Sequence, residues 1–216
     1  MTEITKNLYQ FSSYIPPIDF TIHQYLYASE PSILFAAGTV QQAKQILPEI
    51  KEILGDRELK YIFVSHMESD EAGGIPVFKK EYPGLTVICG DLAARELSGY
   101  GYEGNIIAEC GGELIEDGEL RLRLFDYPAE VHNQNGLLCL EENSGIFYSA
   151  DLMLRYGNGV GNTIRSDWHD EVNSITAERI KDDKQRKELQ CSLHQIDPRF
   201  VAVGHGYCIE CECDTF

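Results

Sequence analysis

The most informative stretch of this 216-residue sequence is His66-Met67-Glu68-Ser69-Asp70-Glu71-Ala72-Gly73-Gly74. It comes directly after the apolar run Tyr61-Ile62-Phe63-Val64, which predicts a buried strand. Polar side chains in a loop at the end of a strand can converge on one point, as the ligands of many metal sites do. His66, Glu68 and Asp70 alternate along this loop. We therefore expect them to face one side and to offer a metal ion nitrogen and oxygen ligands.

Further residues with metal-ligating side chains lie much later in the chain. His132, Asp151 and His205 each follow a short apolar segment that predicts a strand. A single histidine beside a carboxylate is more often a hydrogen-bonded residue than a ligand, so the loop at His66 is weak evidence when it is taken alone. The remaining histidines are expected to be packing or surface residues: His23, His169 and His194.

The stretch from His66 to Gly74 resembles the H-x-[HE]-x-D-H-x-G-G signature of the metallo-β-lactamase fold. With Glu68 at its third position, the motif resembles that of the flavodiiron proteins and of their relatives without a flavodoxin domain, the oxygen-binding diiron proteins. The distant residues match the remaining family ligands in order and approximate spacing, so the resemblance runs from about Ile4 to His205. It implies an α/β (α+β) fold, a four-layer αβ/βα metallo-β-lactamase-like sandwich, in a single domain over residues 1–216.

The resemblance also implies a pair of metal ions and their ligands. Imidazole and carboxylate groups suit iron or manganese, and zinc accepts the same ligands. We expect two Fe ions, with Zn or Mn as alternatives. The implied ligands are His66, Glu68 and His132 for one iron and Asp70 and His205 for the other, with Asp151 bridging the two.

The sequence departs from the family pattern in two places. Glu71 stands where the family commonly has a second histidine. Either Glu71 is an extra ligand of the second metal through an oxygen, or that metal keeps an open or water-filled position. The run Leu34–Thr39 has alanine where the early strand of this fold usually ends with an aspartate that braces the metal loop. We therefore expect altered support around the metals.

The resemblance implies a non-heme diiron protein that binds and reduces O2 or NO, an oxidoreductase. Reduction of O2 to water takes four electrons and two ferrous ions supply two, so an external electron-donor protein is needed. The sequence lacks an evident phosphate loop for FMN, and we expect no FMN in this chain. One alternative is a non-catalytic diiron oxygen sensor that acts on a signalling protein. The other is a dinuclear zinc metallo-hydrolase that attacks esters, thioesters or phosphodiesters. Family analogy also implies a homodimer.

The composition limits the partners and the location of the protein. Carboxylates outnumber Lys and Arg by 35 to 18, which gives a net charge of −17. Such a surface repels phosphate backbones and anionic lipids, so we expect no nucleic-acid or membrane partner. The N-terminus lacks the features of a secretion signal, and the 7 cysteines are an odd number, so we expect a cytoplasmic protein without a disulfide framework. The tail cysteines are open to zinc binding, redox chemistry or no role: Cys208, Cys211 and Cys213.

Several elements can be predicted from local patterns. Apolar spacing predicts a helix over Val40–Leu54, with a kink or restart at Pro48. Two apolar runs on either side of Asn143-Ser144-Gly145 predict a hairpin. The Gly- and Asn-rich stretch Tyr156–Asp167 predicts a loop, and sparse apolar residues predict a long polar helix over Ser174–Ile196.

Overall fold

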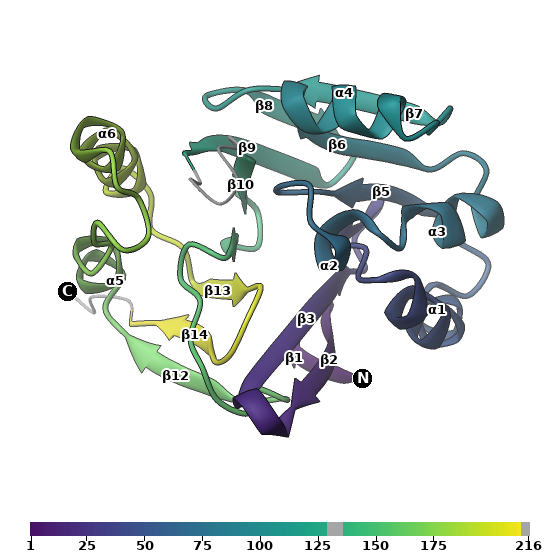
Figure 1. Ribbon diagram of the computed structural model, residues 1–216. Helices are drawn as coiled ribbons and strands as arrows, with labels where there is room; N and C mark the ends of the chain where they lie inside the picture. Colours follow the sequence, from purple (N-terminus) through teal and green to yellow (C-terminus); the bar gives the residue numbers. More distant parts are fainter. Residues whose placement is uncertain (129–135, 213–216) are drawn as a thin grey trace.

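Two seven-stranded sheets pack face to face, and helices cover the outer face of each sheet (Figure 1). The structure is a computed structural model that describes residues 1–128 and 136–212. This arrangement of helix, sheet, sheet and helix layers confirms the α+β fold class and the four-layer sandwich predicted from the sequence.

The first sheet contains the N-terminal half of the chain. Its first four strands form antiparallel pairs, and the pairs from the fourth strand onward are parallel. The strands follow one another in space as they do in sequence: β1 (Thr2–Thr5), β2 (Leu8–Ile15), β3 (Phe20–Tyr27), β4 (Ser32–Phe35), β5 (Leu59–Phe63), β6 (Thr86–Gly90) and β7 (Asn105–Glu109).

The second sheet mixes hairpins with two parallel pairs. β11 is parallel to β13 and β12 is parallel to β14, whereas the other neighbouring strands are antiparallel. The order across the sheet is β12 (Thr163–Ser166), β14 (Cys208–Cys211), β13 (Phe200–Val203), β11 (Ile146–Ala150), β10 (Gly136–Glu141), β9 (Leu120–Tyr127) and β8 (Leu114–Asp117).

Helices bury the outer face of each sheet. The helices α1 (Val40–Leu54), α3 (Ile75–Glu81) and α4 (Asp91–Gly99) cover the first sheet, and α5 (Trp168–Asn173) and α6 (Asp183–Leu193) cover the second. Two short helices, η1 (Pro16–Ile18) and α2 (Ser69–Ala72), complete the set. In the part of the chain that the structure describes, no helix is long and apolar enough to cross a membrane.

Helix α1 confirms its predicted bounds but extends unbroken through Pro48. Thr39 caps its first turn in a capping box with Gln42, in which each side chain accepts a hydrogen bond from the other residue's backbone N–H. Ile46 and Ile50 are buried on either side of the proline. Packing of this apolar face against the sheet offsets the hydrogen bond lost at Pro48, so the helix does not restart there.

Two other predictions were wrong in part. The stretch predicted as a loop contains β12, which pairs with β14, a strand far along the chain. The predicted helix over Ser174–Ile196 is limited to α6, because Asp182 caps a new helix by accepting a hydrogen bond from the backbone N–H of Gln185. Ile180, just before this cap, is fully buried in a turn.

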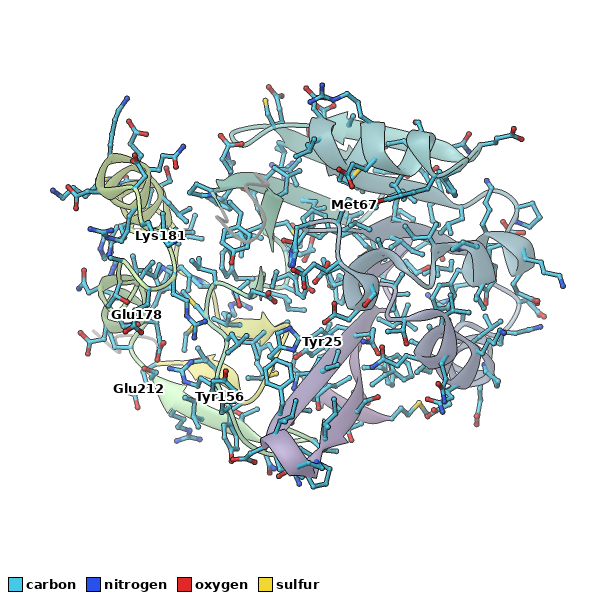
Figure 2. All side chains as sticks on the ribbon, viewed as in Figure 1. Tyr25, Met67, Tyr156, Glu178, Lys181 and Glu212 are labelled. Atoms are coloured by element: carbon cyan, nitrogen blue, oxygen red, sulfur yellow. The ribbon has the colours of Figure 1, made fainter. Side chains whose placement is uncertain are left out.

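Aromatic rings fill the space between the two sheets. Tyr148 of β11 stacks on Phe35 of β4, with 5.4 Å between ring centroids. Tyr25 of β3 is fully buried, and its hydroxyl donates a hydrogen bond of 2.7 Å to the carbonyl of Val203 at the end of β13 (Figure 2). These contacts hold the strand ends that carry the candidate ligands at fixed positions across the sheet interface.

Candidate metal centre

Residues from both halves of the chain meet where three strands end. His66 and Glu68 follow β5, and Asp70 lies in the first turn of α2. Asp151 comes directly after β11, and His205 lies two residues after β13. The two sheets are joined here, because the backbone N–H of His23 in β3 donates a 3.0 Å hydrogen bond to the carbonyl of Gly204. The five candidate ligands that lie in the described residues therefore come together.

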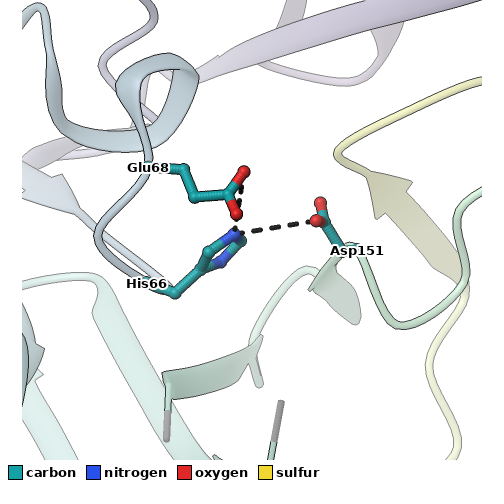
Figure 3. A group of neighbouring side chains, drawn as sticks. All are labelled: His66, Glu68 and Asp151. Carbon is teal, nitrogen blue, oxygen red and sulfur yellow. Dashed lines mark ion pairs between the residues drawn. The ribbon is translucent and has the colours of Figure 1, made fainter. Parts of the chain in front are cut away.

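Asp151 occupies the centre of this group. Its Oδ1 lies 3.1 Å from Nε2 of His205. Its Oδ2 lies 3.6 Å from Nε2 of His66 (Figure 3). Each imidazole also faces a second carboxylate: His205 Nε2 is 3.6 Å from Asp70 Oδ2, and His66 Nε2 is 3.9 Å from Glu68 Oε2. One carboxylate thus lies between two imidazoles, each of which has a further carboxylate beside it.

These separations fit ligands that share metal ions. Two ligand atoms at about 2.1 Å from one ion lie about 3.0–3.4 Å apart at angles of about 90° to 110°, and about 3.6–3.9 Å apart at wider angles of about 120° to 135°. Ligand atoms of His66, Glu68 and Asp151 all lie within 4.8 Å of one another (Figure 3). Nitrogen from imidazole and oxygen from carboxylate are the donors that Fe, Mn and Zn accept. The residues present therefore fit a pair of such ions.

Hydrogen bonds orient the two imidazoles toward the centre. The Nδ1–H of His205 donates to the carbonyl of Thr21 at 3.1 Å, which leaves Nε2 facing the carboxylates. The ring of Phe20 stacks on His205 with 4.4 Å between centroids. Nδ1 of His66 lies 3.3 Å from Oγ of Ser65, so its Nε2 is also directed at the centre. Ring orientation is thereby set by residues outside the ligand group.

The interaction between His205 and Asp151 favours the charged form of each side chain in the metal-free protein. Burial lowers the pKa of His205, but its hydrogen bond to Asp151 and the charges of Asp151 and Asp70 outweigh this effect, so the pKa is raised. Burial raises the pKa of Asp151, but the hydrogen bond and charge of His205 outweigh it, so that pKa is lowered. A metal ion at Nε2 would displace the proton of His205, and metal binding would then release a proton.

His132, the sixth candidate ligand, lies in residues 129–135, outside the described residues. The described chain resumes at Gly136, directly beside the loop of His66. The backbone N–H of Leu137 donates a 3.0 Å hydrogen bond to the carbonyl of Ser65. A Cβ atom added at Gly136 would lie 3.3 Å from Cβ of His66. Gly136 and Leu137 therefore lie beside the candidate centre, and the ligand role of His132 stays a prediction.

Comparison with known proteins identifies the family. The model of the family described as ODP family beta lactamase matches residues 20–206, most of the chain. The chain belongs to this family. The match confirms the family resemblance found in the sequence. A curated relative, an uncharacterized protein of Methanocaldococcus jannaschii, is 24% identical over 176 residues, which cover 80% of this chain and 42% of the relative.

Solved structures share the fold at low identity. The rubredoxin oxygen:oxidoreductase of Desulfovibrio gigas superposes with a TM-score of 0.78 at 15% identity, over 97% of this chain and 57% of that chain. The flavodiiron protein of Giardia intestinalis superposes with a TM-score of 0.75 at 15% identity, over 94% and 54%. A fragment of a diflavin flavoprotein of Nostoc gives 0.74 at 15% identity, over 94% and 85%. The chain spans about half the length of the full flavodiiron chains.

Glu71, which stands where the family commonly has a second histidine, is buried beneath the loop of His66. Its Oε2 accepts a hydrogen bond of 3.1 Å from the backbone N–H of Ser65, and its Oε1 accepts one from the hydroxyl of Tyr148. Burial raises the pKa of Glu71 to about 7. Its carbonyl accepts a 2.7 Å hydrogen bond from the N–H of Ala37, in the run that has alanine where the fold usually has aspartate. Both carboxylate oxygens therefore brace the loop.

Gly74, the last residue of the motif, permits close packing of this loop. Its N–H donates to the carbonyl of Gly38 at 2.6 Å. A Cβ atom at position 74 would lie 2.2 Å from the carbonyl oxygen of Ala37, which no side chain tolerates. The glycine therefore lets the ligand loop lie directly against the end of β4.

His23 supports the loop of His205 and was not recognised from the sequence as more than a packing residue. Its Nε2–H donates a 2.7 Å hydrogen bond to the carbonyl of Gly206, and its Nδ1 accepts one of 2.8 Å from Oγ of Ser12. β2 and β3 carry no strong local signal in the sequence. The contact joins residues far apart in the chain, so only the three-dimensional structure reveals it.

The two tail cysteines in the described residues, Cys208 and Cys211, do not form one cluster. Cys208 and Cys211 are three residues apart in β14, so their side chains lie on opposite faces of the sheet. The thiol of Cys208 lies 3.0 Å from the hydroxyl of Tyr25, and burial raises its pKa to about 11. It is therefore a protonated core group. Cys213 lies outside the described residues.

Proposed function

We propose that this chain is a non-heme diiron protein that binds and reduces O2 or NO with electrons from a separate donor protein in the cytoplasm. In this proposal His66, Glu68 and His132 hold one iron, and Asp70 and His205 hold the other. Asp151 bridges the two. Glu71 is a bracing residue in this proposal, because both of its carboxylate oxygens already accept hydrogen bonds from the protein.

The position of Asp151 is the observation that carries the proposal. Its two oxygens face two different imidazoles, at 3.1 Å and 3.6 Å, as a carboxylate that bridges two ions must. A site for one ion does not require a carboxylate that lies between two groups of ligands, here His66 with Glu68 on one side and His205 with Asp70 on the other. The shared position of Asp151 therefore supports a dinuclear centre over a mononuclear one.

The charge of the centre supports iron and a neutral substrate. Glu68, Asp70 and Asp151 place three carboxylates around two described imidazoles. Anionic oxygen ligands stabilise the more highly charged state of a redox metal, and three of them offset most of the positive charge of two divalent ions, so the centre attracts an anionic substrate such as a phosphodiester less than a centre of neutral ligands would. Two ferrous ions bound here would supply the redox chemistry, and O2 and NO are uncharged. The carboxylate-rich centre is thus suited to a dissolved gas.

The residues around the ligands keep bulk water from one side of the centre. Phe20 stacks on the ring of His205, and the ring of Tyr127 meets His66 edge-on, with 6.3 Å between centroids. Tyr127 is buried, and burial together with the charge of Asp151 raises its pKa. Its hydroxyl therefore stays protonated beside the carboxylates. These groups orient the imidazoles and limit solvent access.

Metal analysis of the protein purified without air tests the proposal. Anaerobic reconstitution with ferrous iron is expected to give two irons per chain and an absorbance change when O2 is added. The variant Asp151→Ala removes the bridge and is expected to lose at least one iron and the coupling between the ions. Glu178→Ala, which removes an exposed carboxylate that is not among the proposed ligands, is the control and is expected to keep both irons.

Three outcomes would contradict the proposal or part of it. A normal iron pair in Asp151→Ala would remove the bridging role. Two tightly held zinc ions without O2 reactivity, together with ester or phosphodiester hydrolysis lost in His66→Ala, would identify a zinc hydrolase. A long-lived O2 adduct in stopped-flow measurements, unchanged by an added reductant, would identify a sensor in place of a reductase.

A further inference from the structure

Two histidines that take no part in the candidate centre meet on the surface of the second sheet's helices. His169 lies in α5, and His194 caps the C-terminal end of α6. Their Nδ1 atoms lie 2.8 Å apart, and their rings are inclined by 30° with 5.0 Å between centroids. His169 is exposed and His194 is partly exposed. Water and dissolved ions therefore have access to this pair.

The protonation of the pair follows from its third partner. Nε2 of His194 lies 3.1 Å from Oδ1 of Asn173, and the tautomer with its proton on Nε2 donates to that oxygen. Nδ1 of a neutral His194 then has a lone pair directed at His169. With that tautomer of His194, the Nδ1–H of His169 is the donor of the 2.8 Å hydrogen bond between the two rings. If the proton of His169 moves to its Nε2, both Nδ1 lone pairs become available, and a small rotation of the rings directs them from each other toward one shared ion.

We propose that His169 and His194 form a second metal site, which binds a divalent late transition-metal ion such as Ni2+ or Cu2+ through both Nδ1 atoms. Two nitrogens at about 2.0 Å from an ion and at a right angle to each other lie about 2.8–2.9 Å apart, as they do here. Tetrahedral coordination requires about 3.3 Å. The observed separation therefore favours the square-planar or tetragonal geometry of Cu2+ and Ni2+ over that of Zn2+. Water fills the remaining positions.

The two helices are held in place independently of the pair. The indole N–H of Trp168 donates a 2.9 Å hydrogen bond to the carbonyl of Leu193, the residue before His194. The amide of Gln190 donates at 3.0 Å to the carbonyl of Val172. The two imidazoles are therefore brought together before any ion binds, which lowers the entropy cost of binding. Asn173 orients one imidazole from the side opposite the ion, as partners of metal-bound histidines do.

Titration of Ni2+ into the full-length protein tests the site by calorimetry. Asp151→Ala serves as the background, because it weakens the proposed iron centre and leaves the outer site intact. When His169→Ala is combined with Asp151→Ala, the affinity of one site for Ni2+ is expected to fall at least tenfold. Addition of Asn173→Ala is expected to weaken the same site about tenfold, because the orienting hydrogen bond is lost. With Cu2+ as the probe, the nitrogen hyperfine structure in electron paramagnetic resonance is expected to change from two nitrogens to one in His169→Ala.

Cys191→Ser is the matched control. Cys191 is exposed and lies three residues before His194, on the same side of α6, but the proposal gives it no role. It is expected to leave the Ni2+ affinity unchanged. The proposal is overturned if Asp151→Ala shows the same isotherm with and without His169→Ala, which would leave the pair as a hydrogen bond only. Loss of the site in Cys191→Ser with retention in His169→Ala would also overturn it. Neither result depends on the proposed iron pair.

Discussion

His23 offers a quantitative test of how the loop of His205 is held. Its imidazole is 1% exposed, its Nε2–H donates to the carbonyl of Gly206, and its Nδ1 lies 2.8 Å from Oγ of Ser12. Burial lowers the pKa of His23 from 6.5 to about 4. The substitution His23→Gln keeps an N–H that can donate toward Gly206 and removes the titrating group.

The sign and size of the effect follow from proton linkage. Between pH 6.5 and pH 4 the unfolded chain binds a proton at position 23 and the folded chain does not, so stability falls as the pH falls. Each pH unit in this window removes about 1.4 kcal/mol, so the full window removes about 3 kcal/mol. Between pH 6.5 and pH 5 we expect His23 to account for about 2 kcal/mol of the loss.

Urea unfolding of the metal-free protein at several pH values measures this directly. The free energy of unfolding of the wild-type protein is expected to fall more steeply from pH 6.5 to pH 5 than that of His23→Gln. The difference in slope isolates position 23 from the carboxylates, which titrate in both proteins. Parallel slopes would refute the reasoning, because His23 would then titrate alike in the folded and unfolded states.

Two further predictions concern the loop that carries His66. Glu71→Ala leaves the backbone N–H of Ser65 without its partner, so it is expected to lower the free energy of unfolding in urea by about 2 kcal/mol more than Glu71→Gln does. Glu71→Gln is expected to retain two irons per chain. Loss of one iron in Glu71→Gln would instead identify Glu71 as a ligand. Gly74→Ala, whose Cβ would collide with a backbone oxygen, is expected to lower the free energy of unfolding by at least about 2 kcal/mol. Gly99→Ala, at the open end of α4, is the control and is expected to change stability by less than about 1 kcal/mol; an equal loss in both would contradict the steric argument.

The parts of the fold that could be predicted depend on contacts close together in sequence. The hairpin of β10 and β11 has its turn signal between its strands, and α1 has its cap and its apolar spacing within one segment. β12 has neither, because it is formed by pairing with β14. The length of α6 depends on the cap at Asp182 and on the burial of Ile180 against other elements. Such long-range packing overrides local propensity.

For the candidate centre, the order and types of the ligands are present in the sequence itself. Histidine and carboxylate side chains at strand ends limit the chemistry to metals that accept nitrogen and oxygen, whatever the details of packing. Only the tertiary structure decides that Asp151 faces both His66 and His205, and that Glu71 binds Ser65 and Tyr148. The direction of a carboxylate depends on which donors lie within about 3 Å, and here those donors come from strands far apart along the chain.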